Sequence, residues 1–237
     1  MRTITGRTFA FRFALVLLCT SAQTIAQDDN EVMDEVITIG TRSADRSVQE
    51  SPVPVDIIDA AELSRSPNIA GELGGLLQSA VPSFSMPRQS NSDQTDIVRS
   101  AQLRGLSPDQ VLVLVNGKRR HSNAVISTES KVGRGSAAVD FNNIPTSAIE
   151  RIEVLRDGAA AQYGSDAIAG VINIVLKDKA EGGDATVSYG AHVTDLDPVD
   201  AEITDGQTLT VSVNHGLTLA NGFINLSAEY RDRSATN

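Results

Sequence analysis

Hydrophobic and polar residues alternate in three segments near the end of the chain. The segments read ATVSYGAH (185–192), TLTVSVNH (208–215) and FINLSAEY (223–230), and each carries apolar residues at every second position. Successive side chains of a β-strand point to opposite faces, so each segment is predicted to form a strand with one apolar and one polar face. We expect about eight to ten residues per strand.

The first of these segments runs from Ala185 to His192, and its connection to the second is long and acidic, TDLDPVDAEITDG (194–206). The second connection, LTLANG (217–222), is short. Long loops that alternate with short turns are typical of outer-membrane β-barrels, whose strands present apolar residues to lipid. A soluble antiparallel sheet with one solvated face gives the same alternation, and the pattern alone does not separate the two. The acidic residues of the long connection lack the glycine and the spacing of a calcium loop, so we expect a solvated loop.

Between residues 51 and 180 the pattern changes to short helices and short strands. SPVPVDIIDAAEL predicts an extended run and then a helix capped by Asp59, and residues 69–81 carry apolar residues at helical spacing before Pro82. DQVLVLVNGKR predicts a buried strand that ends in an Asn116-Gly117 turn. IPTSAIERIEVLRDG predicts a helical turn that leads into a strand, and VINIVLK predicts another strand. We therefore expect an α+β domain with a small mixed sheet and short helices packed on it.

The first 26 residues have the features of a secretory signal peptide. Arg2, Arg7 and Arg12 precede the apolar stretch FALVLLCTSA, which at about ten residues is too short to span a bilayer. We place the cleavage site after Ala26, and the alternative is an N-terminal membrane anchor. Cleavage would remove Cys19, the only cysteine of the chain, and would leave a mature protein without disulfides. Residues 27–50 are then a polar exported segment that precedes the α+β domain.

Charge and motifs exclude several classes of function. The formal net charge of the chain is -10, and loss of the three arginines with the signal peptide lowers it to -13. This charge argues against a nucleic-acid partner, which needs a basic surface. The segment GRGSAA (133–138) fits a loose dinucleotide-binding pattern, but no predicted strand leads into it, so we do not interpret it as a dinucleotide site. The three histidines lack the spacing of metal ligands. We expect no enzyme, no metal site and no cofactor, because no catalytic constellation is present.

Two long motifs carry a family resemblance. QLRGLSPDQVLVLVNGKRRH (102–121) and FNNIPTSAIERIEVLRDGAAAQYGSDAIAGVINIVLK (141–177) closely resemble the plug domain of TonB-dependent outer-membrane receptors. The likeness covers roughly residues 34 to 180. It implies an α+β plug domain (51–180) followed by the first antiparallel strands of a transmembrane β-barrel (181–237), which has about 22 strands in this family. The usual family sequence near the end of these motifs is closer to LRGP and YGSGAIGGVINI. This chain differs from it at residues 157–158 and 165–170, and we expect these differences to alter the local turn.

The resemblance also assigns a role to DEVITIGTR (34–42) in the segment 27–50. This stretch resembles the TonB box, which pairs with an edge strand of the energy-coupling protein TonB. The residues that would bind TonB are Glu35, Val36, Ile37, Thr38 and Ile39. We expect the box to be extended, exposed and unpaired, and the alternatives are a β-prone linker or the first strand of the plug. Its position near the cleavage site leaves no room for a signalling domain, so a transporter is favoured over a transducer.

Other site residues follow from the resemblance and from the loops. Arg104 and Arg156 resemble the plug arginines that pair with barrel glutamates, and the alternative is that they are ordinary surface arginines. Glu150 and Glu153, which flank Arg151, are expected to form local pairs. Polar loops that would face the cell exterior supply the candidate ligand-binding residues, whose arginines suit an anionic or polyhydroxylated ligand: Arg88, Gln89, Asn91, Arg119, Arg120 and His121.

The number of transmembrane strands that the chain can supply decides between a whole receptor and a part of one. The 57 residues after residue 180 provide space for about three transmembrane strands, whereas a closed barrel needs at least about eight. We therefore interpret the chain as the N-terminal plug portion of a receptor for uptake of a scarce ligand, with an iron–siderophore as the leading candidate. Its partners would be TonB with its inner-membrane energising complex, outer-membrane lipid and a small-molecule or metal-chelate ligand. The alternatives are a plug-only periplasmic module that binds a ligand or TonB, and a non-functional truncated gene product.

Overall fold

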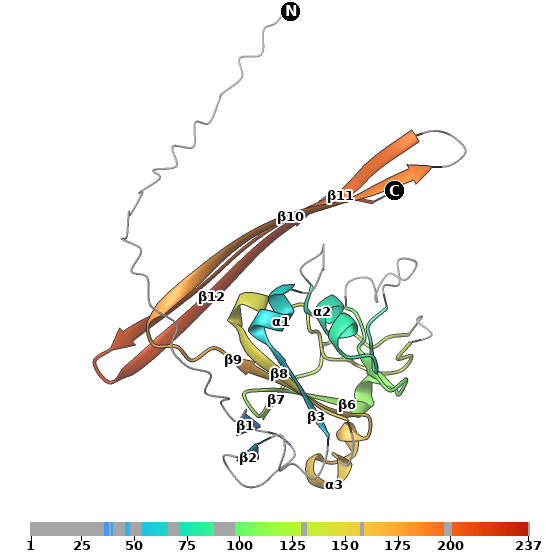
Figure 1. Ribbon diagram of the computed structural model, residues 1–237. Helices are drawn as coiled ribbons and strands as arrows, with labels where there is room; N and C mark the ends of the chain where they lie inside the picture. The colour runs from blue at the N-terminus through green and yellow to red at the C-terminus, as the bar shows by residue number, and fades with distance from the viewer. Residues whose placement is uncertain are drawn as a thin grey trace, which may run out of the picture. The chain divides into compact units, whose positions relative to one another are not determined.

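A five-stranded mixed sheet forms the centre of the predicted α+β domain (Figure 1). The structure is a computed structural model that describes residues 36–37, 39, 46–47, 54–65, 72–87, 98–128, 132–156, 159–196 and 201–236. Strands β6 and β9 are parallel, whereas the other three pairings of this sheet are antiparallel. The strands, in spatial order, are β3 (Val55–Asp59), β8 (Ile149–Leu155), β9 (Gly170–Leu176), β6 (Val111–Val115) and β7 (Lys118–Arg119).

Both faces of this sheet are covered. Helices α1 (Ala60–Arg65) and α2 (Leu73–Ala80) pack on one face, where they share the main hydrophobic core with alternate residues of the strands. A second, smaller core on the other face includes residues next to α3 (Ala160–Tyr163) and in the 3-10 helix η4 (Ser165–Ala167). Strand β6 is apolar throughout because it is buried on both sides. None of the described helices is long and apolar enough to cross a membrane.

The turns that the sequence predicted are present. The Oδ1 atom of Asp59 accepts a hydrogen bond of 2.6 Å from the backbone N–H of Glu62, so Asp59 caps α1 as predicted. Asn116 and Gly117 have φ values of 48° and 73° and connect β6 to β7 in the two-residue turn that an Asn-Gly pair favours. The 3-10 helix η3 (Thr146–Ala148) leads directly into β8, which confirms the predicted helical turn.

Three long antiparallel strands follow the plug, and we call them the wall strands. They are β10 (Gly182–Leu196), β11 (Ala201–Leu219) and β12 (Gly222–Arg233), of 15, 19 and 12 residues. The prediction of about eight to ten residues per strand was therefore wrong. Much of the acidic connection is strand rather than loop, because Asp195 pairs with Glu202 and His192 pairs with Asp205 in the β10–β11 ladder.

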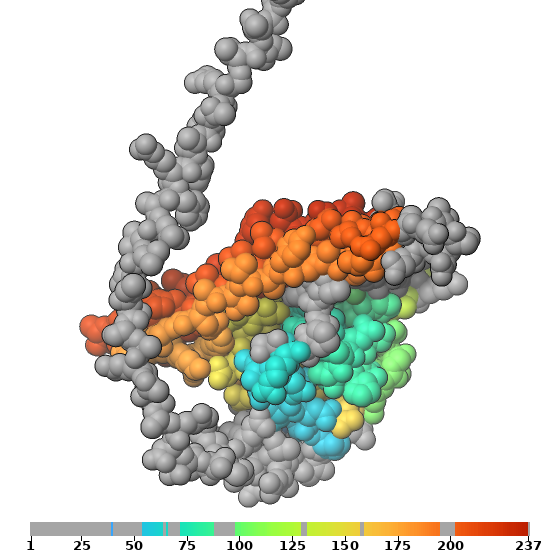
Figure 2. All heavy atoms as spheres, turned by 45° about the horizontal axis from the view of Figure 1, so that its top comes forward, coloured from blue at the N-terminus to red at the C-terminus, as the bar shows by residue number. Residues whose placement is uncertain are grey.

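Strand β11 buries its polar face, β12 half-buries its own, and all three wall strands expose apolar residues, whereas β10 is exposed on both faces. Exposed side chains include Val187 and Tyr189, of which 70% and 71% of the surface is accessible. A soluble sheet buries its apolar face instead, so the polarity of β11 and β12 favours a barrel wall over a soluble sheet. Figure 2 shows these strands, in orange and red, as one continuous surface. The buried polar residues lie at every second position of β11: Thr208, Thr210, Ser212 and Asn214.

Candidate functional site

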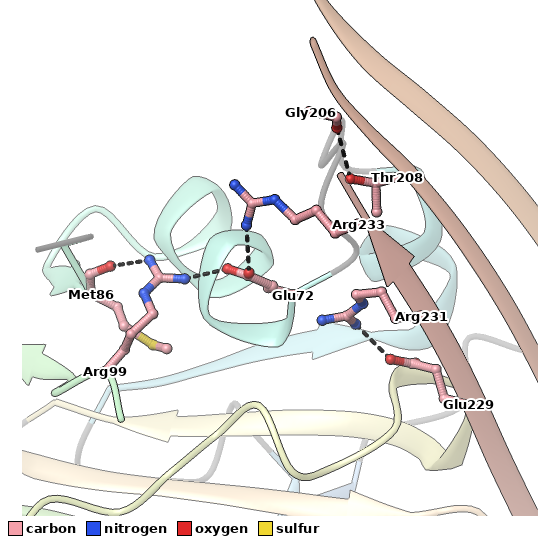
Figure 3. Close-up of polar contacts among 8 residues, drawn as sticks. All are labelled: Glu72, Met86, Arg99, Gly206, Thr208, Glu229, Arg231 and Arg233. Carbon is pink, nitrogen blue, oxygen red and sulfur yellow. Dashed lines mark hydrogen bonds and ion pairs between the residues drawn. The ribbon is translucent and has the colours of Figure 1, made fainter. Parts of the chain in front are cut away.

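Strand β12 carries three charged residues on the same face as its polar residues. Glu229, Arg231 and Arg233 are separated by one residue each, so they point to one side of the strand, whereas Tyr230 between them is exposed on the other. We call these three residues the charged stripe (Figure 3). Their side chains are 13%, 22% and 33% exposed and contact the plug or one another. The polar alternation of the strand thus provides a plug-facing surface of both charges.

Glu229 holds the plug at η3. One carboxylate oxygen, Oε2, accepts hydrogen bonds from the backbone N–H and from the hydroxyl of Thr146, both at 3.3 Å. The other oxygen, Oε1, accepts a hydrogen bond of 2.5 Å from Arg231. Because η3 leads directly into β8, this contact connects the wall strand to the start of a central strand of the plug.

Glu72 forms the second contact between the plug and the charged stripe. It immediately precedes α2, and its backbone carbonyl accepts the N–H groups of Gly75 and Leu76 at 3.0 and 3.2 Å. Its carboxylate lies between two guanidinium groups, as Figure 3 shows. Arg99 of the plug forms an ion pair with Oε2, and Arg233 of β12 lies 3.6 Å from Oε1. A carboxylate between two arginines can hold two segments of the chain together by charge.

The predicted plug arginines make contacts within the plug. Arg104 has a φ of 55° and its Nη2 atom donates a hydrogen bond of 3.1 Å to the carbonyl of Ile168. Arg156 pairs with Asp56 of β3 at 2.8 Å. The expected local pair between Arg151 and Glu153 is confirmed at 3.0 Å. Pairing of Arg104 or Arg156 with a barrel glutamate stays a prediction.

Sequence reasoning missed the contacts that Glu72 and Thr146 of the plug make with the charged stripe. A signal was nevertheless present in β12, where Glu229, Arg231 and Arg233 occupy the polar positions of an alternating strand. Charges at such positions point toward the plug rather than toward lipid. Their partners, however, are distant in sequence, since 83 residues separate Thr146 from Glu229. The charges are also reversed relative to the expectation of plug arginines that pair with barrel glutamates, because Glu72 of the plug contacts Arg233 of β12.

Three of the predicted ligand-binding residues lie around one cavity. Arg119, Arg120 and His121 line a hollow of about 530 Å³ at the end of β7, together with Asp109 and Asp166. Arg119 forms an ion pair with Asp166. The other three predicted residues, Arg88, Gln89 and Asn91, lie outside the described residues. The hollow therefore brings together half of the predicted set, and its role in ligand binding stays a prediction.

The segment predicted to bind TonB is paired with another strand. Strand β1 (Val36–Ile37) is antiparallel to β2 (Arg46–Ser47), and Ile39 is only 1% exposed in the smaller core. The expectation of an unpaired segment is therefore wrong at Val36 and Ile37, and the expectation of an exposed segment is wrong at Ile39. Val36 and Ile37 form a strand as predicted, and pairing with β2 gives that strand the ladder partner that an isolated strand lacks. Glu35 and Thr38 lie outside the described residues.

Comparison with known proteins identifies the family. Residues 47–171 match the model of the TonB-dependent Receptor Plug Domain, which covers more than half of the chain. The chain therefore belongs to this family. The resemblance in its motifs and the predicted fold class, a plug followed by antiparallel strands, are confirmed.

The relatives that the chain matches are named as receptors or transporters. It is 32% identical to the ferric enterobactin receptor PirA of Pseudomonas aeruginosa over 69% of this chain and 23% of that protein. It is 46% identical to the vitamin B12 transporter BtuB of Vibrio cholerae over 37% of this chain and 13% of that protein. The siderophore receptor PirA of Acinetobacter baumannii has a similar structure, with a TM-score of 0.54 and 26% identity over 78% of this chain and 25% of that one. The chain thus spans about a quarter or less of these relatives.

Proposed function

We propose that the chain is the N-terminal plug portion of a TonB-dependent outer-membrane receptor for energised uptake of a scarce ligand. The observation that carries this proposal is the inverted polarity of β11 and β12, which expose apolar residues while their polar residues are buried or contact the plug. Such a surface is stable where lipid covers it. The signal peptide would export the chain, and the plug and the TonB box would lie on the periplasmic side of the outer membrane.

The plug acts mechanically in this proposal. TonB, driven by its inner-membrane complex, would pair with the box and pull on the plug, and the bound ligand would then pass. The polar nature of the contacts between plug and wall supports such a step, because hydrogen bonds and partly exposed ion pairs rearrange at little cost. The pairing of β1 with β2 adds one requirement, since TonB has to replace β2 as the partner of Val36 and Ile37.

An iron–siderophore is the ligand class that we propose. Two relatives are named as ferric enterobactin receptors, at 32% and 29% identity to this chain. Arg119 and Arg120 at the hollow near β7 can donate to anionic groups of a ligand, although Asp109 and Asp166 line the same hollow and Asp166 already pairs with Arg119. The name of the BtuB relative makes vitamin B12 the second candidate.

The first test measures the size and location of the native product with an antibody against the plug. A band several times larger than 25.1 kDa in the outer-membrane fraction is expected, because a complete barrel needs many more strands. Uptake of iron–siderophores by cells that carry or lack the gene then tests the ligand class. A product of about this size in the periplasm or in aggregates would contradict the transport function and leave a binding module or a truncated product.

The TonB box is tested by two proline variants. Ile37→Pro removes a backbone donor from the box and is expected to abolish binding of the purified chain to the periplasmic domain of TonB. Ser47→Pro disturbs β2 and leaves the box sequence intact, so it is expected to preserve or strengthen binding by freeing β1. Unchanged binding by Ile37→Pro would refute the assignment of the box.

A further inference from the structure

Three residues from three parts of the fold form a continuous charged link. Glu72 precedes α2, Arg99 lies shortly before β5 (Gln102–Leu103), and Arg233 ends β12. Figure 3 shows the Glu72 carboxylate between the two guanidinium groups. The side chains of Glu72 and Arg99 are 14% and 10% exposed, so the link begins inside the plug. Arg233 is 33% exposed and brings the link to the wall strand.

Arg99 also closes the base of a plug segment. Its Nη2 atom donates a buried hydrogen bond of 2.7 Å to the carbonyl of Met86, 13 residues earlier in the chain. Strand β4 (Phe84–Ser85) pairs with β5 just beyond this bond, with Phe84 opposite Leu103. A short ladder and the Arg99 guanidinium thus hold Met86 to the chain around Arg99. We call the Met86–Arg99 hydrogen bond the segment closure.

Met86 is fixed by its side chain as well. It is fully buried, and its sulfur lies against Gly74 of α2, where an added Cβ would be only 2.2 Å away. Gly74 thus allows the Met86 side chain to pack directly on the backbone of α2. The residue that precedes this helix by one position is Glu72. Any shift of Glu72 therefore reaches Met86 by two routes, through Arg99 and through α2.

The two ion pairs of Glu72 differ in strength. The pair with Arg99 is close and mostly buried, and such a pair is costly to break because either partner is left as an unpaired buried charge. The contact with Arg233 is longer, at 3.6 Å, and more exposed, so it forms and breaks readily. Arg99 and Glu72 therefore move together as part of the plug, and Arg233 is the releasable member.

We propose that Glu72 is a positioning residue that couples wall strand β12 to the segment closure, so that displacement of Arg233 is transmitted to Met86. The inference rests on the proposed function in one respect, since β12 is taken to be part of a barrel wall. Within that function, the link connects the wall to Met86 in the main core of the plug.

The test uses the methyl signal of Met86 in the full 237-residue chain in detergent micelles. The chain has three methionines, so a spectrum of protein labelled with carbon-13 at the methionine methyl groups is simple, and Met86→Leu identifies the signal. Arg233→Gln is expected to shift the Met86 signal, whereas Arg233→Lys, which keeps the charge, is expected to retain its position. Arg231→Gln is the matched control, since Arg231 lies on the same face of β12 but pairs with Glu229.

A double variant separates coupling from a local disturbance. Glu72→Gln is expected to shift the Met86 signal, and Arg233→Gln is expected to add no further shift in that background. A Met86 signal that stays in place in Arg233→Gln would overturn the proposal. If Glu72→Gln does not fold, the Arg233 variants still decide the matter, because Arg233 lies at the exposed end of the link. The measurement uses neither TonB nor a ligand, so its failure is distinct from failure of the proposed function.

Discussion

The plug sheet and the wall strands use apolar residues in opposite ways. Strand β6 of the plug is apolar on both sides because helices and loops cover both faces of its sheet. The wall strands hide Thr208, Ser212 and other polar residues and expose Tyr189 and Val187. The plug is therefore held together internally by apolar packing but is held to the wall by polar contacts. In the proposed function, this difference would let the contacts with the wall rearrange while the apolar core of the plug stays closed.

The largest expected effect comes from removing apolar volume inside the plug. Ile152 of β8 is fully buried in the main core, and Ile152→Ala is expected to lower the free energy of unfolding by about 2–5 kcal/mol. Leu226→Ala on the exposed face of β12 is expected to change it by less than about 0.5 kcal/mol in detergent. Chemical denaturation followed by circular dichroism measures both. Equal losses at the two positions would contradict the contrast between the regions.

A charge on the exposed face of the wall sharpens the same contrast in a membrane. Leu226→Lys in the complete receptor is expected to cost about 2–4 kcal/mol of membrane stability, because the lysine would face the lipid interior. Leu219→Lys is the matched control, since Leu219 lies at the β11–β12 turn, and a charge near the interface costs about 0–1 kcal/mol. Unfolding from lipid vesicles measures both variants. A cost that does not depend on position would argue against lipid contact.

The sequence predicted elements whose pattern is local. The apolar run of β6, the Asn116-Gly117 turn and the helical turn before β8 are each specified by neighbouring residues, and all three are present. The acidic residues around Asp195 and Glu202 were predicted to form a loop, because charged side chains usually face solvent. They instead continue β10 and β11, because each of these two strands has the other beside it as a ladder partner. Hydrogen bonds of the ladder, rather than side-chain preference, determine that extension.

Long-range polar contacts were not predictable in the same way. Arg156 pairs with Asp56, 100 residues earlier, across β3 and β8, and this contact was not predicted. The residues around Glu72 in the sequence do not indicate its contact with Arg233, because this contact depends on where the fold places the two side chains. For the segment at Val36 and Ile37, the β propensity was read correctly, whereas its pairing with β2 depends on the path of the chain.

A polar group buried inside the plug provides a smaller test of the contrast. Asn173 is fully buried and connects two elements, since its amide donates to Glu153 at 3.1 Å and its carbonyl accepts the N–H of Gly117 at 3.0 Å. Asn173→Ala leaves both groups without this partner, and the expected loss of unfolding free energy is about 1–3 kcal/mol. Asn143→Ala removes an exposed amide that donates to Asp140 and is expected to stay within about 0.5 kcal/mol. Matching losses in denaturation experiments would mean that burial does not govern these contacts.

The smallest expected effect concerns an ion pair at the plug surface. Arg156 and Asp56 are 41% and 35% exposed, so Arg156→Gln is expected to lower the stability of this chain by at most about 1 kcal/mol, and less at high salt. Asp56→Asn should give the same loss, and the double variant should add nothing further, because both remove one interaction. The same variants in the complete receptor distinguish the two assignments of Arg156. If Arg156→Gln destabilises the plug there far more than Asp56→Asn does, a barrel glutamate is a second partner of Arg156, as the family resemblance implies; equal small losses would leave Asp56 as the partner that matters.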